Sequence, residues 1–317
     1  MRGRKTVWFL AVCAFVLGLV NPALAWIDFP EDAEEPDSLV SEEKRLEKWD
    51  ISVDIGFAQS QSTYSPNWDG EEEGTFQWTS GLNASAQKRI SPRYSTRTTL
   101  KLEYGQSQTQ DRDFSTWSAP AKTTDNIELE SIFRFRSGGT LDPFAAGKIQ
   151  SQFTDERIEE TYYGNPVVFT ESAGLAWAFW ENIQNKHLIV RFGGALHQRY
   201  DINYIVDSTD STEVRGKKII SDAGLEMVSE MVTPLIQDRV RLNAKITLFQ
   251  SLHNSLSDEL RNNDWRMVDA DFEAIFTTRV TKNIAVKLNF RWMYDKEISP
   301  AGRFKELITL NLVYSLL

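Results

Sequence analysis

Side chains suited to acid–base or nucleophilic chemistry are scarce in this sequence. It contains three histidines, His187, His197 and His253, and a single cysteine, Cys13. No metalloprotease, nucleophile-elbow, phosphate-loop or zinc-ligand spacing occurs. The run DSTDSTE at 207–213 has oxygen ligands suited to calcium, but it lacks EF-hand order and the turn glycine, so we interpret it as a solvated acidic loop. We therefore expect no catalytic residue, no cofactor and no metal site.

Charged side chains follow a much clearer pattern. Four consecutive segments carry charges at alternate positions, and the sign changes from each segment to the next. The segments present Asp222, Glu226 and Glu230, then Arg239, Arg241 and Lys245, then Asp269, Asp271 and Glu273, and finally Lys287 and Arg291. Neighbouring strands lie about 4.8 Å apart, so opposite charges on adjacent segments can pair.

The elements that position these charges are predicted to be β-strands. In the stretch DNIELESIFRFRS, Leu129 and Phe133 alternate with Glu130 and Arg134. Alternation with a period of two residues indicates a strand that has two different faces. About twelve such segments follow one another between residues 48 and 317, and long helical patterns are absent.

The connections between these segments alternate between short and long. Short turns are expected near 91–93, 137–142, 182–186, 233–237 and 281–283, and longer polar loops are expected in between. Transmembrane barrels have short periplasmic turns and long outer loops, with an even number of antiparallel strands. The sequence therefore predicts an all-β protein, a transmembrane antiparallel up-and-down β-barrel of about 12 strands, with both chain ends on the periplasmic side.

The two strand faces differ too much for the charged one to be a soluble core, because unpaired buried charges are very costly. The predicted strands are also long enough to cross a membrane when tilted, which takes roughly 9–11 residues. Aromatic residues near the strand ends resemble two interfacial girdles: Tyr104, Phe153, Phe169, Trp265, Trp292 and Tyr294 at one rim, and Tyr94, Phe135, Phe179, Phe276 and Tyr314 at the other. A secreted β-sandwich that binds a partner through aromatic loops is the alternative fold.

In a barrel, the apolar faces contact lipid and the charged faces line the lumen. The residues expected to line the lumen are Arg97, Lys101, Glu103, Glu128, Glu130, Arg134, Lys148, Arg191, His197, Asp222, Glu226, Arg239, Arg241, Lys245, Asp269, Asp271, Glu273, Lys287 and Arg291. They predict either an interior held together by ion pairs or a narrow passage for a small polar solute. A barrel of about twelve strands lies between small filled barrels and open porins, so size does not decide between them.

A third function, hydrolysis of lipids, would need an outward-facing histidine beside a serine. Some outer-membrane barrels are phospholipases that carry such a pair on the lipid face. His187 and His197 share the inward parity, and His253 is expected in a loop. We therefore expect that the protein is not an enzyme.

The N-terminus has the pattern of a secretory signal peptide. Basic residues precede the apolar run 6–20, and Ala23-Leu24-Ala25 forms a small-residue cleavage site. We expect a signal peptide at 1–25, an acidic periplasmic leader at 26–47 and the barrel at 48–317. The mature chain would then lie in the outer membrane of a Gram-negative bacterium and lack cysteine.

The mature chain would have 32 basic and 45 acidic residues, because the signal contains three basic residues and no acidic ones. This balance makes nucleic acid an unsuitable partner. The expected partners are outer-membrane lipid, lipopolysaccharide, the barrel-assembly machinery and a small polar solute.

Two short runs carry a family resemblance. Residues 122–131 (KTTDNIELES) and 169–174 (FTESAG) resemble strand motifs of an uncharacterised family of outer-membrane barrels, a domain of unknown function. The resemblance implies a barrel over 48–317 with no established substrate and no catalytic residues. One departure is the C-terminus, which ends in Leu317 where such barrels usually end in an aromatic residue.

Overall fold

The computed structural model describes residues 49–63, 73–111, 116–156, 161–183, 186–207, 214–236, 239–257, 263–281 and 284–315. The predicted signal peptide 1–25, the predicted leader 26–47 and the terminal Leu317 lie outside the described residues. The acidic run at 207–213 is described only at Asp207. Among the described residues, no helix is long and apolar enough to cross a membrane.

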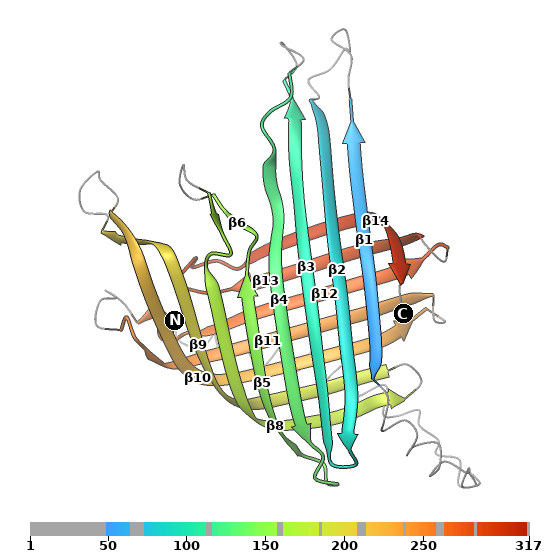
Figure 1. The fold of residues 1–317 in the computed structure, drawn as a ribbon, viewed down its shortest axis with the longest axis vertical. Helices are drawn as coiled ribbons and strands as arrows, with labels where there is room; N and C mark the ends of the chain where they lie inside the picture. The colour runs from blue at the N-terminus through green and yellow to red at the C-terminus, as the bar shows by residue number, and fades with distance from the viewer. Residues whose placement is uncertain are drawn as a thin grey trace, which may run out of the picture. The chain divides into compact units, whose positions relative to one another are not determined.

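Twelve strands form one closed antiparallel barrel, in which each strand pairs with two neighbours. They are β1 (Asp50–Ser62), β2 (Gly74–Ser91), β3 (Tyr94–Gln110), β4 (Ala121–Phe135), β5 (Asp142–Ser151), β8 (Val167–Ile183), β9 (Lys186–Asp207), β10 (Val214–Leu235), β11 (Val240–Asn254), β12 (Val268–Arg279), β13 (Ile284–Tyr294) and β14 (Arg303–Ser315). In Figure 1 the blue to green strands β1 to β4 run along the near wall, and the orange to red strands cross behind them. The predicted fold class and strand number are confirmed.

Two small elements lie in the connections between barrel strands. A short hairpin, β6 (Thr154–Asp155) with β7 (Tyr162–Tyr163), lies between β5 and β8. A single 3-10 turn, η1 (Asp264–Arg266), lies between β11 and β12. Neither element pairs with the barrel sheet.

Short and long connections alternate along most of the chain, as the sequence predicts. Connections of two to six residues join β2 to β3, β4 to β5, β8 to β9, β10 to β11 and β12 to β13. Connections of eight to fifteen residues join the other consecutive strands, except for β9 and β10, whose connection of six residues is as short as that between β4 and β5. Consecutive strands are antiparallel, so the first five connections named here lie at one end of the barrel, hereafter the short-turn end. The opposite end is the long-loop end, and in a membrane barrel it is the outer one.

Most of the large apolar side chains face outward and most of the charged ones face inward. Phe133 and Trp177 are 42% and 44% exposed, whereas Glu130 and Arg191 are 7% and 4% exposed. An exposed belt of large apolar residues over an ionised interior is the arrangement of a transmembrane barrel and the inverse of a soluble one. Trp265, one of the residues expected in the girdles, departs from this pattern. It belongs to the turn η1, is buried, and has the guanidinium of Arg266 over its ring.

The barrel closes through a short seam between its first and last strands. Among the described residues, which end at Ser315, β1 and β14 are matched over five pairs, from Asp54 with Ser315 to Ala58 with Asn311. By comparison, β1 and β2 are matched over thirteen pairs, from Asp50 with Gln87 to Ser62 with Thr75. The ladder that joins the two ends of the sheet is therefore much shorter than the ladder inside the adjoining hairpin.

Candidate functional site

Five charged side chains meet inside the barrel and form what we call the ion network: Arg97, Glu130, Arg191, Glu230 and Lys245. Nη2 of Arg191 lies 2.8 Å from Oε1 of Glu130 and 2.8 Å from Oε1 of Glu230. Nζ of Lys245 lies 3.1 Å from Oε2 of Glu130 and 3.9 Å from Oε1 of Glu230. Arg97 donates a direct hydrogen bond to Oε2 of Glu230. Each carboxylate therefore contacts at least two cations.

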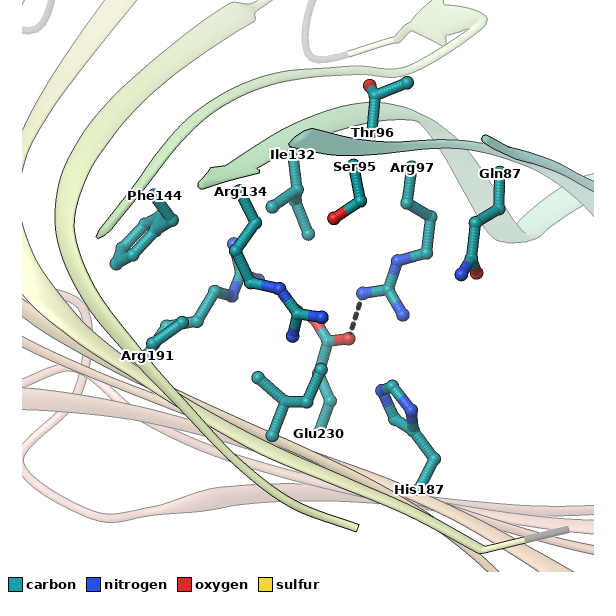
Figure 2. Close-up of a pocket in the computed structure, with 12 residues that line it drawn as sticks. Gln87, Ser95, Thr96, Arg97, Ile132, Arg134, Phe144, His187, Arg191 and Glu230 are labelled. Atoms are coloured by element: carbon teal, nitrogen blue, oxygen red, sulfur yellow. Dashed lines mark hydrogen bonds and ion pairs between the residues drawn. The ribbon is translucent and has the colours of Figure 1, made fainter. Parts of the chain in front are cut away.

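These contacts cross the lumen and do not simply join neighbouring strands. Arg97 on β3 and Glu230 on β10 are separated by β4, β5, β8 and β9 on the shorter way round the barrel. Lys245 on β11 and Glu130 on β4 are likewise separated by four strands. Figure 2 shows Arg97 directed at the Glu230 carboxylate, with Arg134 and Arg191 to one side and His187 to the other. The ion network thus joins opposite walls of the barrel.

A second bridge lies beside the ion network, nearer the long-loop end. Lys101 on β3 donates a 3.1 Å hydrogen bond to Glu273 on β12, again across four intervening strands, and lies 3.7 Å from Glu103. On adjacent strands, Arg291 contacts Asp271 at 2.7 Å. The sequence predicted pairing between adjacent strands, and three contacts fit that prediction: Arg291–Asp271, Lys245–Glu230 and the 2.8 Å contact of Arg191 with Glu230. The contacts of Arg97 with Glu230 and of Arg191 and Lys245 with Glu130 join strands that are not neighbours.

The remaining predicted lumen residues lie around these bridges. Gln150 donates a 3.0 Å hydrogen bond to Glu128. Arg134 is buried and lies 3.6 Å from Asp142 at the short-turn end. Lys148 and Glu226 line a small cavity beside Glu130 and Lys245. Each of these predicted lumen residues therefore has a polar or charged group nearby.

Two further cavities lie against the ion network. One, of about 370 Å³, lies between β1–β4 and β10–β12 and is lined by Asp54, Asn83, Lys101, Asn243 and Glu273 among others. The other, of about 50 Å³, lies toward the short-turn end between Arg97, Arg134, Arg191 and Glu230. Most of the residues that line the larger cavity are polar or charged, and it has room for several water molecules or one small solute.

The lumen mouth at the long-loop end is acidic. Asp222 and Asp269 come from the strands β10 and β12, and Asp295 and Glu297 come from the β13–β14 connection. Burial, together with the nearby carboxylates Asp222, Asp295 and Asp264, raises the pKa of Glu297 to about 7. This mouth therefore gains negative charge as the pH rises through neutrality.

His197 also lies toward the long-loop end of the lumen. His197 stacks on Phe249 at 4.0 Å, and its Nε2 lies 3.8 Å from Glu226.

The hairpin β6–β7 is tied to the barrel by Asn165, whose Nδ2 donates to Asp155 at 2.7 Å and to Asp201 at 3.2 Å. Oδ1 of Asn165 accepts the backbone N–H of Ile202. In the sequence, the turn-forming Asn165-Pro166 dipeptide is the signal that marks this junction.

Two residues lie elsewhere than the alternation predicts. Arg239 is exposed in the turn before β11, because that strand begins one residue later. His253 belongs to β11 and is not in a loop, and a register shift places it opposite Ala223 while Ser251 pairs with Gly224. A bulge of this kind turns the following side chain to the other face, so His253 shares the outer face with Ala223.

Arg241, Asp269 and Lys287 complete the set of predicted lumen residues. Arg241 is exposed near the short-turn end of β11, and Lys287 is half-buried on β13 at a similar level. Asp269 is half-buried at the opposite end, one residue after the start of β12. These three residues are not part of the ion network.

Several solved structures align with most of this chain at low sequence identity. The translocator domain of the autotransporter NalP from Neisseria meningitidis is 11% identical over 86% of this chain and 92% of that chain, with a TM-score of 0.34. An outer membrane channel from Pseudomonas putida F1 is 10% identical over 90% of this chain and 99% of that chain, with a TM-score of 0.41. The NanC porin is 7% identical over 84% of this chain and all of that chain, with a TM-score of 0.37. At these identities and scores, the likenesses carry no information on function.

No curated protein matches the chain. Residues 59–156, which include the run 122–131, match the family described as "Protein of unknown function (DUF3078)", and this match confirms the resemblance expected from the sequence.

Proposed function

We propose that this protein is an outer-membrane β-barrel whose lumen is a narrow passage for small polar solutes, closed at the level of the ion network. The observation that carries the proposal is the contact of Glu130 and Glu230 with cations from the far wall. These bridges consist of side chains alone, so they can part and re-form while the backbone ladder of the barrel stays intact. Opening the lumen at this level would require at least that Arg97 and Lys245 leave these two carboxylates.

The cavity volumes support a passage of restricted size. The chamber of about 370 Å³ beside the network is at the lower end of the volumes of small-molecule sites, so it fits a small solute and is too small for a long oligosaccharide or peptide. Its walls contain both ammonium and carboxylate groups, such as Lys101 and Glu273. We therefore expect weak selection between cations and anions at this level.

A structural barrel with a permanently sealed lumen is the second candidate. It is favoured by the burial of Arg191 and Glu130, whose side chains are only 5% and 9% exposed. Buried ion pairs that lose one partner are strongly destabilised, so such a network resists opening. This candidate predicts a stable barrel that carries no current.

Conductance of the purified barrel in planar lipid bilayers separates the two candidates. We expect small or infrequent current steps for the wild type and more frequent openings for Glu230→Gln, because Arg97 and Arg191 then lose a shared counter-ion. The control is Glu306→Gln, an equal charge change at an exposed residue that pairs with the outward-facing Phe290. A silent wild type together with a silent Glu230→Gln variant, both correctly folded, would overturn the passage and favour the sealed barrel.

We also propose that the protein is not an enzyme. His253 is the histidine that faces outward, and among the described residues no hydrogen bond joins its side chain to a serine hydroxyl. A lipid hydrolase requires that pairing to activate its nucleophile. Signal cleavage and transport into the outer membrane are proposed on the N-terminal sequence and on the apolar outer surface.

A further inference from the structure

The lumen wall formed by β10 to β13 carries opposite charges at its two ends. The acidic mouth described above lies at the long-loop end. At the short-turn end of the same wall lie Arg241 on β11, Arg279 on β12 and Lys287 on β13. Asp269 and Arg279 are ten residues apart on β12, which at about 3.3 Å per residue places them roughly 33 Å apart along the strand.

The three cations surround one threonine. In the strand register, Thr277 lies directly opposite Arg241 on one side and directly opposite Lys287 on the other. Each step is one strand spacing of about 4.8 Å. Arg279 lies two residues beyond Thr277 on the same strand face, so it is a diagonal neighbour of both cations at about 7–8 Å.

All three side chains belong to the inner face of the barrel. Side chains two, four or six residues apart on a regular strand share a face. Arg241 is four residues from Lys245, Arg279 is six from Glu273, and both of these reference residues make contacts across the lumen. Lys287 is four residues from Arg291, which pairs in register with Glu273. No register shift interrupts β11, β12 or β13 over these positions.

We call Arg241, Arg279 and Lys287 the triad. Its positive charge is not balanced by close carboxylates, unlike that of the cations in the ion network. Arg241 and Arg279 are exposed and Lys287 is half-buried. Among the residues that the structure describes, none of the three has a carboxylate oxygen within 4.0 Å, whereas every cation of the ion network does. Asp54 and Glu103 act on Lys287 only at longer range. Like charges on neighbouring positions of a sheet repel one another, so the triad favours the arrival of an anion.

We propose that Arg241, Arg279 and Lys287 form an anion-binding site at the short-turn mouth of the lumen, for small molecules that carry two or more phosphate or carboxylate groups. Two guanidinium groups can each bind an oxyanion with paired N–H donors, and the ammonium group adds a point charge. The hydroxyl of Thr277 lies at the centre as a further donor. The site lies on the short-turn side of the ion network, so an anion can reach it whether or not the lumen opens.

Titration calorimetry with pyrophosphate as the probe tests this site on the purified full barrel in detergent and phosphate-free buffer. We expect saturable binding to the wild type, weakened about tenfold or more by Arg241→Gln or Arg279→Gln, because a hydrogen bond to a charged group contributes roughly 1.5–3 kcal/mol. The matched control is Arg93→Gln, which removes the same charge from an exposed turn at the same end, between β2 and β3. The control should bind pyrophosphate like the wild type, and thermal unfolding should show that all variants are folded.

Two results would overturn the site. One is the absence of saturable pyrophosphate binding to the wild-type barrel. The other is equal weakening by Arg93→Gln and Arg241→Gln, which would mean that general electrostatics at this end attract the anion.

A second arm identifies the source of the oxyanion. The wild-type barrel and the Arg241→Gln variant are reconstituted into vesicles of phosphatidylglycerol or of phosphatidylcholine, and the amount of each lipid retained by the protein is measured. If Arg241→Gln lowers retention of phosphatidylglycerol and leaves pyrophosphate binding unchanged, the arginine contacts lipid headgroups and the lumen site is wrong. Because binding and conductance are separate readouts, a barrel that binds pyrophosphate but carries no current would overturn only the proposed passage.

Discussion

Two arginine–carboxylate pairs in the lumen have nearly the same length and very different surroundings. Arg191 and Glu130 are 2.8 Å apart with side chains 5% and 9% exposed, and Arg291 and Asp271 are 2.7 Å apart with both side chains 40% exposed. Burial removes the water that would otherwise solvate a charge left without its partner. The two pairs therefore differ in what happens when one member is removed.

We predict that Arg191→Met destabilises the barrel by about 3–5 kcal/mol, because Glu130 would remain buried and lose one of its two cations. Arg291→Met, the same substitution at the exposed pair, should change stability by about 0–1 kcal/mol. Urea-induced unfolding in lipid vesicles, followed by tryptophan fluorescence, measures both. Equal effects of the two substitutions would contradict the conclusion that Arg191 and Glu130 are buried from solvent.

At the scale of the strand, β8 and β9 approach each other closely at a glycine pair. Gly174 and Gly193 lie opposite each other in register, and a Cβ on Gly193 would lie 2.1 Å from the carbonyl oxygen of Ala173. A Cβ on Gly174 would lie equally close to the carbonyl oxygen of Phe192. The absence of side chains at these two positions therefore lets the strands that carry Arg191 and Ser172 come together.

Gly193→Ala should force the two strands apart and destabilise the barrel by about 1–3 kcal/mol, the usual effect of overpacking. Gly147→Ala on β5 is the control, because a Cβ there has no heavy atom within 4 Å. The two variants can be compared by their unfolding temperatures on heat-modifiability gels. A Gly193→Ala barrel that melts together with Gly147→Ala would show that the close approach is not required.

Alternation of residues predicts the face of each strand but not the partner across the barrel. The charges of Glu130 and Glu230 could be assigned to the lumen from sequence, because a period of two residues separates the faces. Their cross-lumen partners depend on strand tilt and barrel closure, which one-dimensional spacing does not contain. The bulge that turns His253 outward was missed for a similar reason, since an extra residue in one strand shows only when the register with its neighbour is known.

At the scale of the whole molecule, the outer surface distinguishes a membrane barrel from a soluble one. Leu129 in the middle of β4 and Leu141 in the β4–β5 turn are both exposed, at 37% and 46%. In water, a charge would be tolerated at either position. In a bilayer, only Leu129 would contact hydrocarbon.

We predict that Leu129→Arg costs about 2–4 kcal/mol of stability in lipid vesicles, the range for an arginine near the bilayer midplane. Leu141→Arg should have an effect of less than about 1 kcal/mol, because its side chain lies beyond the strands. Unfolding in urea from vesicles measures the difference, and cell fractionation shows whether each variant reaches the outer membrane. Equal tolerance of both substitutions would contradict the transmembrane assignment.

The pairing of β1 with β14 determines when the barrel can close during synthesis and folding. The first strand cannot find its final partner until the last strand has been synthesised, because Asp54 pairs with Ser315 across nearly the whole length of the chain. Closing so long a loop is slow compared with forming hairpins such as β1–β2. Until the last strand arrives, the new chain therefore has two sheet edges whose backbone groups are unpaired. In the folded barrel, the short ladder between β1 and β14, five pairs in the described residues, is where the sheet would open most readily to the membrane.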